Sequence, residues 1–323
     1  MKIAILGVGA YAIALARVFD KNKDNEVMMW AKFKEEASVV IKKRENPGVL
    51  PGIKIPSDIK ITMNLGACME GASIVILAVP AVAVRQVSEE VSVYAKKDQI
   101  LCVVSKGIEP KTNMFMSEIL YQATKNENIC MISGPSFAIE IAKGAKTGFN
   151  IACKNIEVAN IVKEQFENGL VVSTCDDIIG VQVAASIKNV FAIFMGMLTG
   201  MDMTDSYKAS CLACLVRDLG EVIVALGGKR DTIFTYAGLG DMLLTCMSSK
   251  SRNFTFGTYI GRGYSMQNAF ETMSVKTVEG IYTLSTITDL MKSKNFKVKS
   301  LEVLYGILYN NDSKDNLLDK IRM

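Results

Sequence analysis

The sequence predicts an α/β fold in which a doubly wound, mostly parallel sheet is followed by an all-helical domain. Three observations predict it. Short apolar strand patterns alternate with helical patterns, a glycine-rich turn follows the first strand pattern, and strand patterns stop near residue 180, where helical periodicity takes over. We therefore expect a first domain at residues 1–180 and a second at residues 181–323, a division that suits a chain of 323 residues.

The expected strands are short apolar segments separated by helical stretches. They lie at Lys2–Leu6, Glu26–Trp30, Ile59–Asn64, Ser73–Val79, Gln99–Ser105, Ile129–Ser133, Phe149–Cys153 and Val171–Cys175. Strand–helix alternation is typical of a parallel sheet with helices on both faces. Ligands of such sheets bind beyond the carboxyl ends of the strands, so the residues after each strand are the candidates for function.

The first strand is followed directly by the turn Gly7-Val8-Gly9-Ala10-Tyr11-Ala12, and a helix is expected over Ile13–Phe19. This is the glycine pattern of dinucleotide-binding, Rossmann-type domains. Gly7 permits the tight turn, Gly9 lets the backbone approach a pyrophosphate, and Ala12 allows close helix–strand packing. The helix N-terminus then faces the anion. The alternative is a glycine-rich turn that binds no ligand.

The second strand ends at Ala31-Lys32, where sites that prefer NAD usually carry Asp or Glu. A cation there favours the 2′-phosphate of NADP, so we expect NADP as cofactor with NAD tolerated. The alternative is that Lys32 is a solvated surface residue. A second lysine, Lys106, directly follows the strand Gln99–Ser105, where a substrate is expected. It can equally be an ordinary loop lysine.

A strongly apolar helical run at 180–197 carries a single charge, Lys188. Its neighbours three and four residues away are Ala184, Ala185, Phe191 and Ala192, and the polar residues Gln182, Ser186 and Asn189 form an adjacent stripe. Two interpretations follow. The lysine stem is buried while the ammonium reaches water, or the ammonium is desolvated beside a cleft and its pKa falls until it exchanges protons near neutrality.

Composition narrows the possible chemistry. The chain contains no histidine, so proton transfer near neutral pH would need a tuned lysine, carboxylate, cysteine or tyrosine. The net charge of +4 and the absence of a long Lys/Arg block argue against nucleic acid as a partner. The apolar stretch Ser73–Val84 is too short to span a bilayer. No signal-peptide pattern precedes the first strand, so we expect a cytoplasmic protein. Cys211 and Cys214 form an isolated C-x-x-C in a helical pattern, for which we expect no metal.

Two stretches of the second domain carry further candidates. Asp241 follows Ala237-Gly238-Leu239-Gly240 and is either a functional carboxylate or a helix N-cap. Arg252 lies among Ser251 and Asn253, and because a guanidinium pairs with phosphate in bidentate fashion, this is a candidate phosphate site. The alternative is a solvated loop.

Taken together, these stretches resemble the NAD(P)-dependent glycerol-3-phosphate dehydrogenase family. Segments in family order run nearly end to end. Besides the amino-terminal turn they are 46–56 (Asn-Pro-Gly-Val-Leu-Pro-Gly-Ile-Lys-Ile-Pro), 78–80 (Ala-Val-Pro), 105–109 (Ser-Lys-Gly-Ile-Glu), 132–138 (Ile-Ser-Gly-Pro-Ser-Phe-Ala), 187–190 (Ile-Lys-Asn-Val), 237–241 (Ala-Gly-Leu-Gly-Asp), 251–253 (Ser-Arg-Asn) and 278–280 (Val-Glu-Gly).

The resemblance implies interconversion of dihydroxyacetone phosphate and sn-glycerol 3-phosphate by a homodimer that uses NADP or NAD. It implies Lys188 as the proton donor and acceptor and Lys106 as a second substrate lysine. The implied substrate-site positions are Lys106, Gly134, Ser136, Lys188, Asp241, Ser251, Arg252 and Asn253. The implied cofactor contacts, with Gly7, Gly9 and Ala12 of the turn, are Ala10, Tyr11, Lys32, Lys106, Ala138, Arg252 and Glu279.

The chemistry expected from this set centres on Lys188. Hydride moves from the nicotinamide to the ketone carbon while the ammonium stabilises the carbonyl oxygen and then protonates it. Lys106 adds a second positive charge, which lowers the lysine pKa. Asp241 orients a lysine, and Arg252 with Asn253 holds the phosphate.

The chain departs from the family pattern in places. It has Ala10-Tyr11-Ala12 where the family usually has Ser-Trp-Gly, and Cys214 where arginine is common; the stretch 205–209 also differs. Two other functions remain open at this point. One is a related two-domain NADP-dependent hydroxy-acid reductase of the ketopantoate type, and the other is a non-catalytic dinucleotide sensor.

Overall fold

The computed structural model describes residues 1–166, 170–275 and 277–322, which fall into two compact units. The first comprises Met1–Lys106 and Phe115–Ile178, and the second comprises Gly107–Met114 and Ile179–Met323. The short segment Gly107–Met114 therefore packs with the helical part of the chain although it follows a strand of the sheet. The functional boundary at residue 180 stays a prediction.

The first unit is built on an eight-stranded sheet with the order β3-β2-β1-β4-β5-β6-β7-β8. The strands are β1 (Lys2–Leu6), β2 (Glu26–Trp30), β3 (Lys60–Thr62), β4 (Ile74–Leu77), β5 (Ile100–Val103), β6 (Ile129–Ser133), β7 (Gly148–Cys153) and β8 (Val171–Cys175). The predicted strands are all present. β3, β4 and β5 are shorter than expected because the end residues of those apolar runs lie outside the ladder.

Neighbouring strands are parallel except for β6 and β7, which pair antiparallel with Cys130 opposite Cys153 and Ser133 opposite Asn150. A parallel connection must cross back over the sheet, usually through a helix. Between β6 and β7 the chain forms only the five-residue helix α6 (Ala138–Ala142), so β7 runs in the opposite direction. The mostly parallel sheet that the sequence predicts is therefore confirmed.

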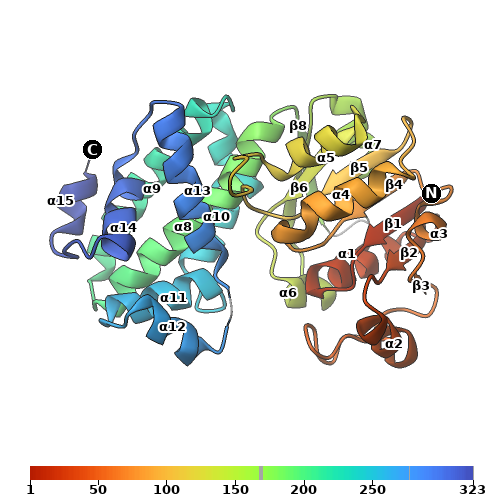
Figure 1. The fold of residues 1–323 in the computed structure, drawn as a ribbon, viewed down its shortest axis with the longest axis horizontal. Coiled ribbons are helices and arrows are strands. Elements are labelled where there is room, and N and C mark those ends of the chain that lie inside the picture. Colours follow the sequence, from red (N-terminus) through yellow and green to blue (C-terminus); the bar gives the residue numbers. More distant parts are fainter. Residues whose placement is uncertain (167–169, 276, 323) are drawn as a thin grey trace. The chain divides into compact units, whose positions relative to one another are not determined.

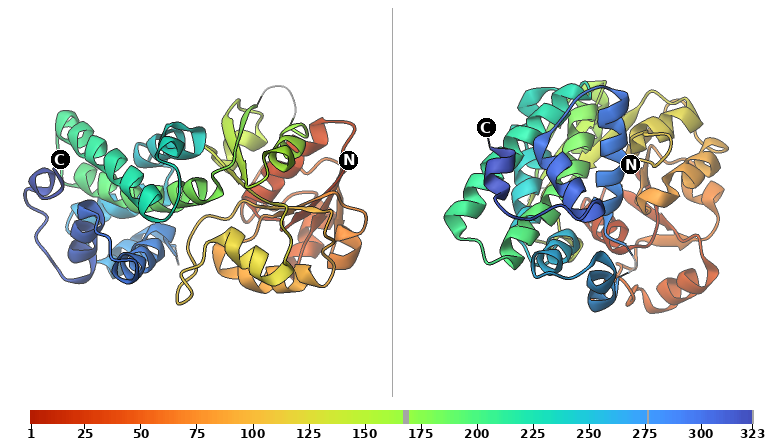
Figure 2. Two further views of the ribbon diagram at one scale, coloured as in Figure 1. Left: turned by 90° about the horizontal axis from the view of Figure 1, so that it is seen from above. Right: turned by 60° about the vertical axis from the view of Figure 1, so that its left-hand side comes forward.

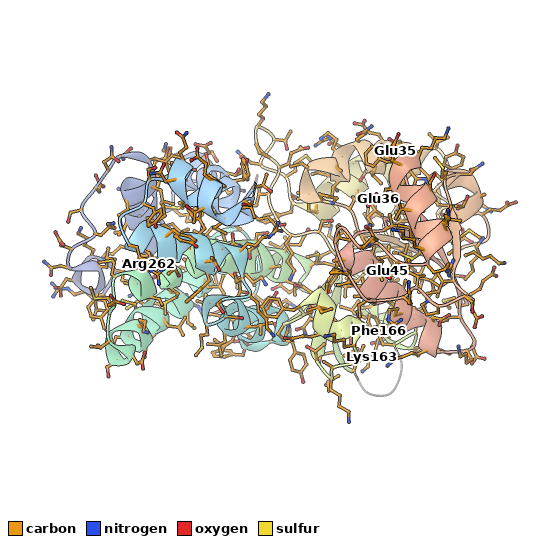
Figure 3. The ribbon with its side chains drawn as sticks, turned by 90° about the horizontal axis from the view of Figure 1, so that it is seen from below. Glu35, Glu36, Glu45, Lys163, Phe166 and Arg262 are labelled. Atoms are coloured by element: carbon orange, nitrogen blue, oxygen red, sulfur yellow. The ribbon has the colours of Figure 1, made fainter. Side chains whose placement is uncertain are left out.

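Helices cover both faces of this sheet (Figure 2). They are α1 (Ala10–Lys21), α2 (Lys34–Lys43), α3 (Leu65–Met69), η1 (Ala81–Ala83), α4 (Val84–Ser92), α5 (Met116–Thr124), α6 and α7 (Ile156–Lys163). α1 packs against α6, and α4 against α5. Phe166, labelled in Figure 3, follows α7 and packs its ring 4.7 Å from Phe19 of α1 and 5.8 Å from Phe149 of β7. These aromatic contacts fix α1, and with it the glycine-rich turn, onto the sheet.

Among the described residues of the second unit, every element from Ile178 onward is a helix (Figure 1), whereas the segment Gly107–Met114 contains no helix. Its helices are α8 (Ile178–Gly200), α9 (Asp205–Ala225), η2 (Arg230–Phe234), η3 (Tyr236–Gly240), α10 (Asp241–Cys246), α11 (Arg252–Gly261), α12 (Met266–Met273), α13 (Glu279–Ser293), α14 (Lys299–Tyr309) and α15 (Leu317–Ile321). This confirms the expected change from strands to helices.

The central helix α8 is long and apolar enough to cross a membrane by length and composition alone, but 94% of its most apolar window is buried inside the protein. It is therefore typical of the core helix of a folded domain. A Cβ at Gly196 of α8 would lie 2.0 Å from the carbonyl oxygen of Phe254, and one at Gly257 of α11 would lie 2.0 Å from that of Ile193. The backbones of α8 and α11 thus touch, which glycine alone permits.

Candidate active site

The glycine-rich turn has the geometry of an anion site. Gly7 adopts φ +128°, and a Cβ there would lie 2.6 Å from the carbonyl oxygen of Ala78. Gly9 precedes α1, has open space where a Cβ would be, and offers no side chain to cap the helix. The first turn of α1 carries no acidic residue. The helix N-terminus is thus open to a ligand, and its free N–H groups and positive dipole end favour a phosphate. The turn therefore fits the pyrophosphate of a dinucleotide.

The turn is joined to a second predicted stretch. The hydroxyls of Tyr11 and Ser136 are hydrogen-bonded at 3.0 Å, and Ser136 Oγ donates to the carbonyl of Gly134 at 2.8 Å. A Cβ at Gly134 would lie 2.2 Å from the carbonyl oxygen of Gly148, so Gly134 also has a structural reason to be glycine. The structure therefore brings together Tyr11, expected at the cofactor, and Ser136, expected at the substrate. Ala12 is fully buried, as close helix packing requires.

Asn46 is a residue to which the sequence assigns no role. Its buried side-chain amide donates to the carbonyl of Val8, in the middle of the glycine-rich turn, at 2.9 Å. The same nitrogen donates to the carboxylate of Glu36 at 2.8 Å, and Glu36 is labelled on α2 in Figure 3. Asn46 thus positions the turn through these hydrogen bonds, and its side chain is buried rather than directed to a ligand.

Asn46→Ala is expected to weaken dinucleotide binding by about 3- to 10-fold. The hydrogen bond from the Asn46 side chain is worth roughly 1 kcal/mol, and its loss leaves the Val8 carbonyl without this partner. Calorimetric titration with NAD⁺ and NADP⁺ measures it. The matched control is Asn64→Ala, which removes the N-cap of α3 in the same unit and should lower stability with unchanged affinity. Equal affinity in the Asn46 variant and the wild type would contradict this role.

Lys32 is not a freely solvated surface residue. Its ammonium lies 2.5 Å from the carboxylate of Glu90 on α4 and 5.9 Å from the ring centroid of Trp30. Both charged side chains keep about a third of their surface exposed, at 27% and 34%. The cation expected to receive a 2′-phosphate therefore already has an anionic neighbour that the sequence did not indicate.

The carboxyl ends of β4 and β5 are tied together, as neighbouring strands of one sheet should be. Ser105 Oγ donates to the carbonyl of Val79 at 2.5 Å. Lys106 follows directly and is half-buried, while Ala138, also half-buried, begins α6. Lys106 and the turn at Gly7–Ala12 thus follow strand ends of the first unit, as predicted, and Ala138 begins the helix after β6. What each binds stays a prediction.

In the second unit, Lys188 is buried and ion-paired. The residue is 5% exposed, and its Nζ donates to Oδ1 of Asp241, which is 1% exposed. The ammonium also donates to Oγ1 of Thr245 at 2.9 Å. Thr245 Oγ1 in turn donates to the Asp241 carbonyl at 2.6 Å, so its lone pairs are directed to the lysine. The interpretation in which the ammonium reaches water is wrong, because the Lys188 side chain is only 6% exposed. The burial that the second interpretation requires is present, while the cleft beside the lysine and the lowered pKa stay predictions.

Asp241 is not the N-cap of its helix. Gly240 occupies that position, and Asp241 is the first residue of α10. Its carboxylate faces Lys188, and Thr245 lies one turn further along α10 on the same face. Neighbouring Cys246 is fully buried, which raises its pKa to about 12, so it remains a thiol and leaves Lys188 and Asp241 as the charged pair.

A chain of side-chain amides connects the lysine helix to two other predicted residues. Asn253 Nδ2 donates to Oδ1 of Asn189 at 3.1 Å, and Asn189 Nδ2 donates to the carboxylate of Glu279 at 3.3 Å. The backbone N–H of Gly280 donates to Asn253 Oδ1 at 2.9 Å. Asn253 and Glu279, expected at substrate and cofactor, are thus held in one network by the neighbour of Lys188.

Arg252 lies at the N-terminus of α11 with an exposed side chain. Ser251 is the N-cap, and its Oγ accepts from the backbone N–H of Phe254 at 3.3 Å. Arg252 and Asn253 form the first turn of a helix rather than a loop, but Arg252 is exposed to solvent, so its phosphate role stays a prediction. A guanidinium beside a helix N-terminus is chemically suited to a phosphate.

The sequence does not predict a role for four residues that contact candidate site residues: Asn46, Glu90, Asn189 and Thr245. Thr245 could have been found, because Asp241 and Thr245 are four residues apart on one helix face. Asn189 belongs to the polar stripe on α8, in which Ser186 Oγ accepts from the Gly107 backbone N–H at 3.0 Å. Asn46 and Glu90 gave no local signal.

Cys211 and Cys214 are both buried free thiols in α9, and burial raises the Cys211 pKa to about 12.

Comparison with known proteins decides the family. Residues 2–159 match the model of the NAD-dependent glycerol-3-phosphate dehydrogenase N-terminus, and residues 177–319 match that of the C-terminus. The chain belongs to the NAD-dependent glycerol-3-phosphate dehydrogenase family. A glycerol-3-phosphate dehydrogenase [NAD(P)+] of Listeria innocua is 33% identical over 322 residues, covering 98% of this chain and 95% of the relative.

Solved structures agree with this membership. The crystal structure of the glycerol-3-phosphate dehydrogenase of Coxiella burnetii superposes with a TM-score of 0.90 at 26% identity, covering 99% of this chain and 98% of that one. A ketopantoate reductase from Ralstonia eutropha reaches a TM-score of 0.59 at 14% identity, covering all of both chains. That likeness concerns the fold alone, so the rival reductase assignment is not favoured over the dehydrogenase family.

Proposed function

We propose that the chain interconverts dihydroxyacetone phosphate and sn-glycerol 3-phosphate, with NADP or NAD as the redox cofactor. The observation that carries the proposal is the buried ammonium of Lys188, fixed by Asp241 and Thr245 in a chain of the dehydrogenase family without histidine. In this proposal residues 1–180 bind the dinucleotide and residues 181–323 bind the substrate. Lys106 provides a second positive charge to the substrate.

The roles of the residues follow from their contacts. A bound reduced nicotinamide supplies the hydride for the ketone carbon. As the carbonyl oxygen gains negative charge, the Lys188 ammonium stabilises it and then transfers a proton to it. The carboxylate of Asp241 compensates the charge of the buried Lys188 ammonium, and the Thr245 hydroxyl accepts a hydrogen bond from that ammonium. The lysine therefore presents its charge from a fixed place, which spares reorganisation during the reaction.

The remaining residues are proposed to position the substrate and the cofactor. Arg252 and Asn253 hold the phosphate, and the Asn189 network keeps Asn253 and Glu279 in register. The glycine-rich turn, with Ala10 and Tyr11, takes the pyrophosphate. Binding energy from the phosphate, remote from the reacting carbon, then fixes the ketone relative to Lys188.

Further parts of the proposal rest on family membership. The product supplies glycerol 3-phosphate for phospholipid synthesis, the protein works in the cytoplasm, and it forms a homodimer without a nucleic-acid partner. The altered turn Ala10-Tyr11-Ala12 and Cys214 are the features that a non-catalytic dinucleotide sensor would explain.

The test of the function is oxidation of NADPH and NADH by the purified protein in the presence of dihydroxyacetone phosphate, with ketopantoate as the competing substrate. Turnover of dihydroxyacetone phosphate with either cofactor supports the proposal. Dinucleotide binding without turnover would identify a sensor, and turnover of ketopantoate alone would identify the rival reductase.

Arg252→Ala is expected to raise KM for dihydroxyacetone phosphate by about 10- to 100-fold, the value of a charge-assisted phosphate contact, with a much smaller effect on kcat. Steady-state kinetics measure both constants. Arg262→Ala is the matched control, because Arg262 is exposed at the opposite end of the same helix (Figure 3). An unchanged KM in the Arg252 variant would place the phosphate elsewhere.

A further inference from the structure

We propose that Glu90 determines the choice between NAD and NADP and turns it toward NAD. The inference deepens the proposed function and rests on it. It reverses the cofactor preference that Lys32 alone predicts, because the structure pairs the Lys32 ammonium with a carboxylate from another element.

The position of the pair carries the inference. In dinucleotide-binding sheets the acidic residue that binds the adenosine ribose stands at the end of the second strand. Here Ala31 and Lys32 follow β2, and neither is acidic. Glu90, from the last turn of α4, places its carboxylate 2.5 Å from the Lys32 ammonium. A carboxylate from a different element therefore lies at the tip of the side chain that directly follows β2.

The two side chains are held but accessible. Lys32 Nζ lies 5.9 Å from the ring centroid of Trp30, whose Nε1 donates to the Met63 carbonyl at 3.0 Å. The ring is thus fixed, and it favours a cation above its face. With 27% and 34% of their surface exposed, Lys32 and Glu90 remain within reach of a ligand.

The chemistry of the ribose then discriminates the cofactors. A 2′-hydroxyl donates a hydrogen bond to a carboxylate, so NAD can bind while the ion pair stays intact. A 2′-phosphate would have to draw Lys32 away from Glu90 and would lie beside a carboxylate of like charge. Glu90 therefore favours the hydroxyl and opposes the phosphate, while Lys32 keeps NADP from being excluded.

The test is Glu90→Gln, which keeps the shape of the side chain and removes its charge. We expect calorimetric titration of the whole protein to show NAD⁺ binding at least as tightly as NADP⁺ in the wild type. The variant should shift the affinity ratio toward NADP⁺ by about tenfold, the value of one charge-assisted interaction. Glu89→Gln, which removes the same charge from the exposed neighbour on α4, should leave the ratio unchanged.

The second comparison introduces Glu90→Gln into the Lys32→Ala variant. Without the cation, Glu90→Gln should shift the affinity ratio of the two dinucleotides much less. A ratio that moves by less than about twofold in Glu90→Gln, or equally in Glu89→Gln, would overturn the proposal. If both dinucleotides bind with the expected shift but dihydroxyacetone phosphate is not reduced, the proposed function fails and the cofactor choice stands. If neither dinucleotide binds, both are overturned.

Discussion

Lys188→Met is expected to lower kcat by about 10²–10⁴-fold, the usual contribution of a positioned acid. Methionine retains the apolar stem that packs in α8 and removes the ammonium that Asp241 and Thr245 hold. The dinucleotide should still bind, because the residues proposed for its pyrophosphate lie in the first unit. Steady-state kinetics and calorimetric titration with NAD⁺ measure the two effects separately.

Loss of stability must be distinguished from loss of chemistry in this variant. Removing one partner of a buried ion pair leaves an uncompensated charge and costs about 3–5 kcal/mol. Asp241 is 1% exposed, so Lys188→Met alone is expected to unfold at a lower temperature. The double variant Lys188→Met/Asp241→Asn removes both charges and should recover much of that stability while kcat stays low.

Two outcomes would count against the role of Lys188. Turnover within a few-fold of the wild type in Lys188→Met would remove the lysine from the chemistry. Recovery of both stability and kcat in the double variant would show that the pair only stabilises the fold.

The sheet could be predicted almost completely from the sequence, because a buried parallel strand is a continuous apolar run with recognisable ends. β1, β2, β6 and β8 begin and end where their patterns do. β3 is shorter than its predicted run because only Lys60–Thr62 lie opposite its partner β2, from Met28 to Trp30. The antiparallel direction of β7 depends on how the connection through α6 packs, which a local pattern does not contain.

The candidate residues were predictable as chemical types, but their partners were not. Lys188 stood out as the single charge in an apolar helix, yet the spacing around it cannot show that Asp241 lies against it from a helix 53 residues later. Lys32 likewise had two plausible environments, and only the tertiary contact with Glu90 decides between them. Helix periodicity is a local property, whereas burial and pairing of charge depend on contacts between distant segments.

The crossing of α8 and α11 gives the second large expected effect. Gly257 faces Ile193 of α8, and a Cβ at this position would lie 2.0 Å from the Ile193 carbonyl oxygen and 2.9 Å from the backbone nitrogen of Met197. Both are backbone atoms of a helix, which cannot rotate away as a side chain can. Gly257→Ala is therefore expected to push the helices apart and to cost about 3 kcal/mol of stability, the upper part of the usual range for overpacking.

Thermal denaturation should show this as a fall in Tm of roughly 5–10 °C. The matched control is Gly220→Ala in α9, where the nearest atom to a new Cβ is 3.5 Å away and alanine should gain up to about 1 kcal/mol of helix propensity. Because α8 carries Lys188 and Asn189 while α11 carries Arg252 and Asn253, a wider crossing should also stretch the 3.1 Å bond between the two asparagines. KM for dihydroxyacetone phosphate should then rise in Gly257→Ala below its Tm. If Tm is unchanged, the two backbones do not touch here, and the close crossing does not set the position of the phosphate site.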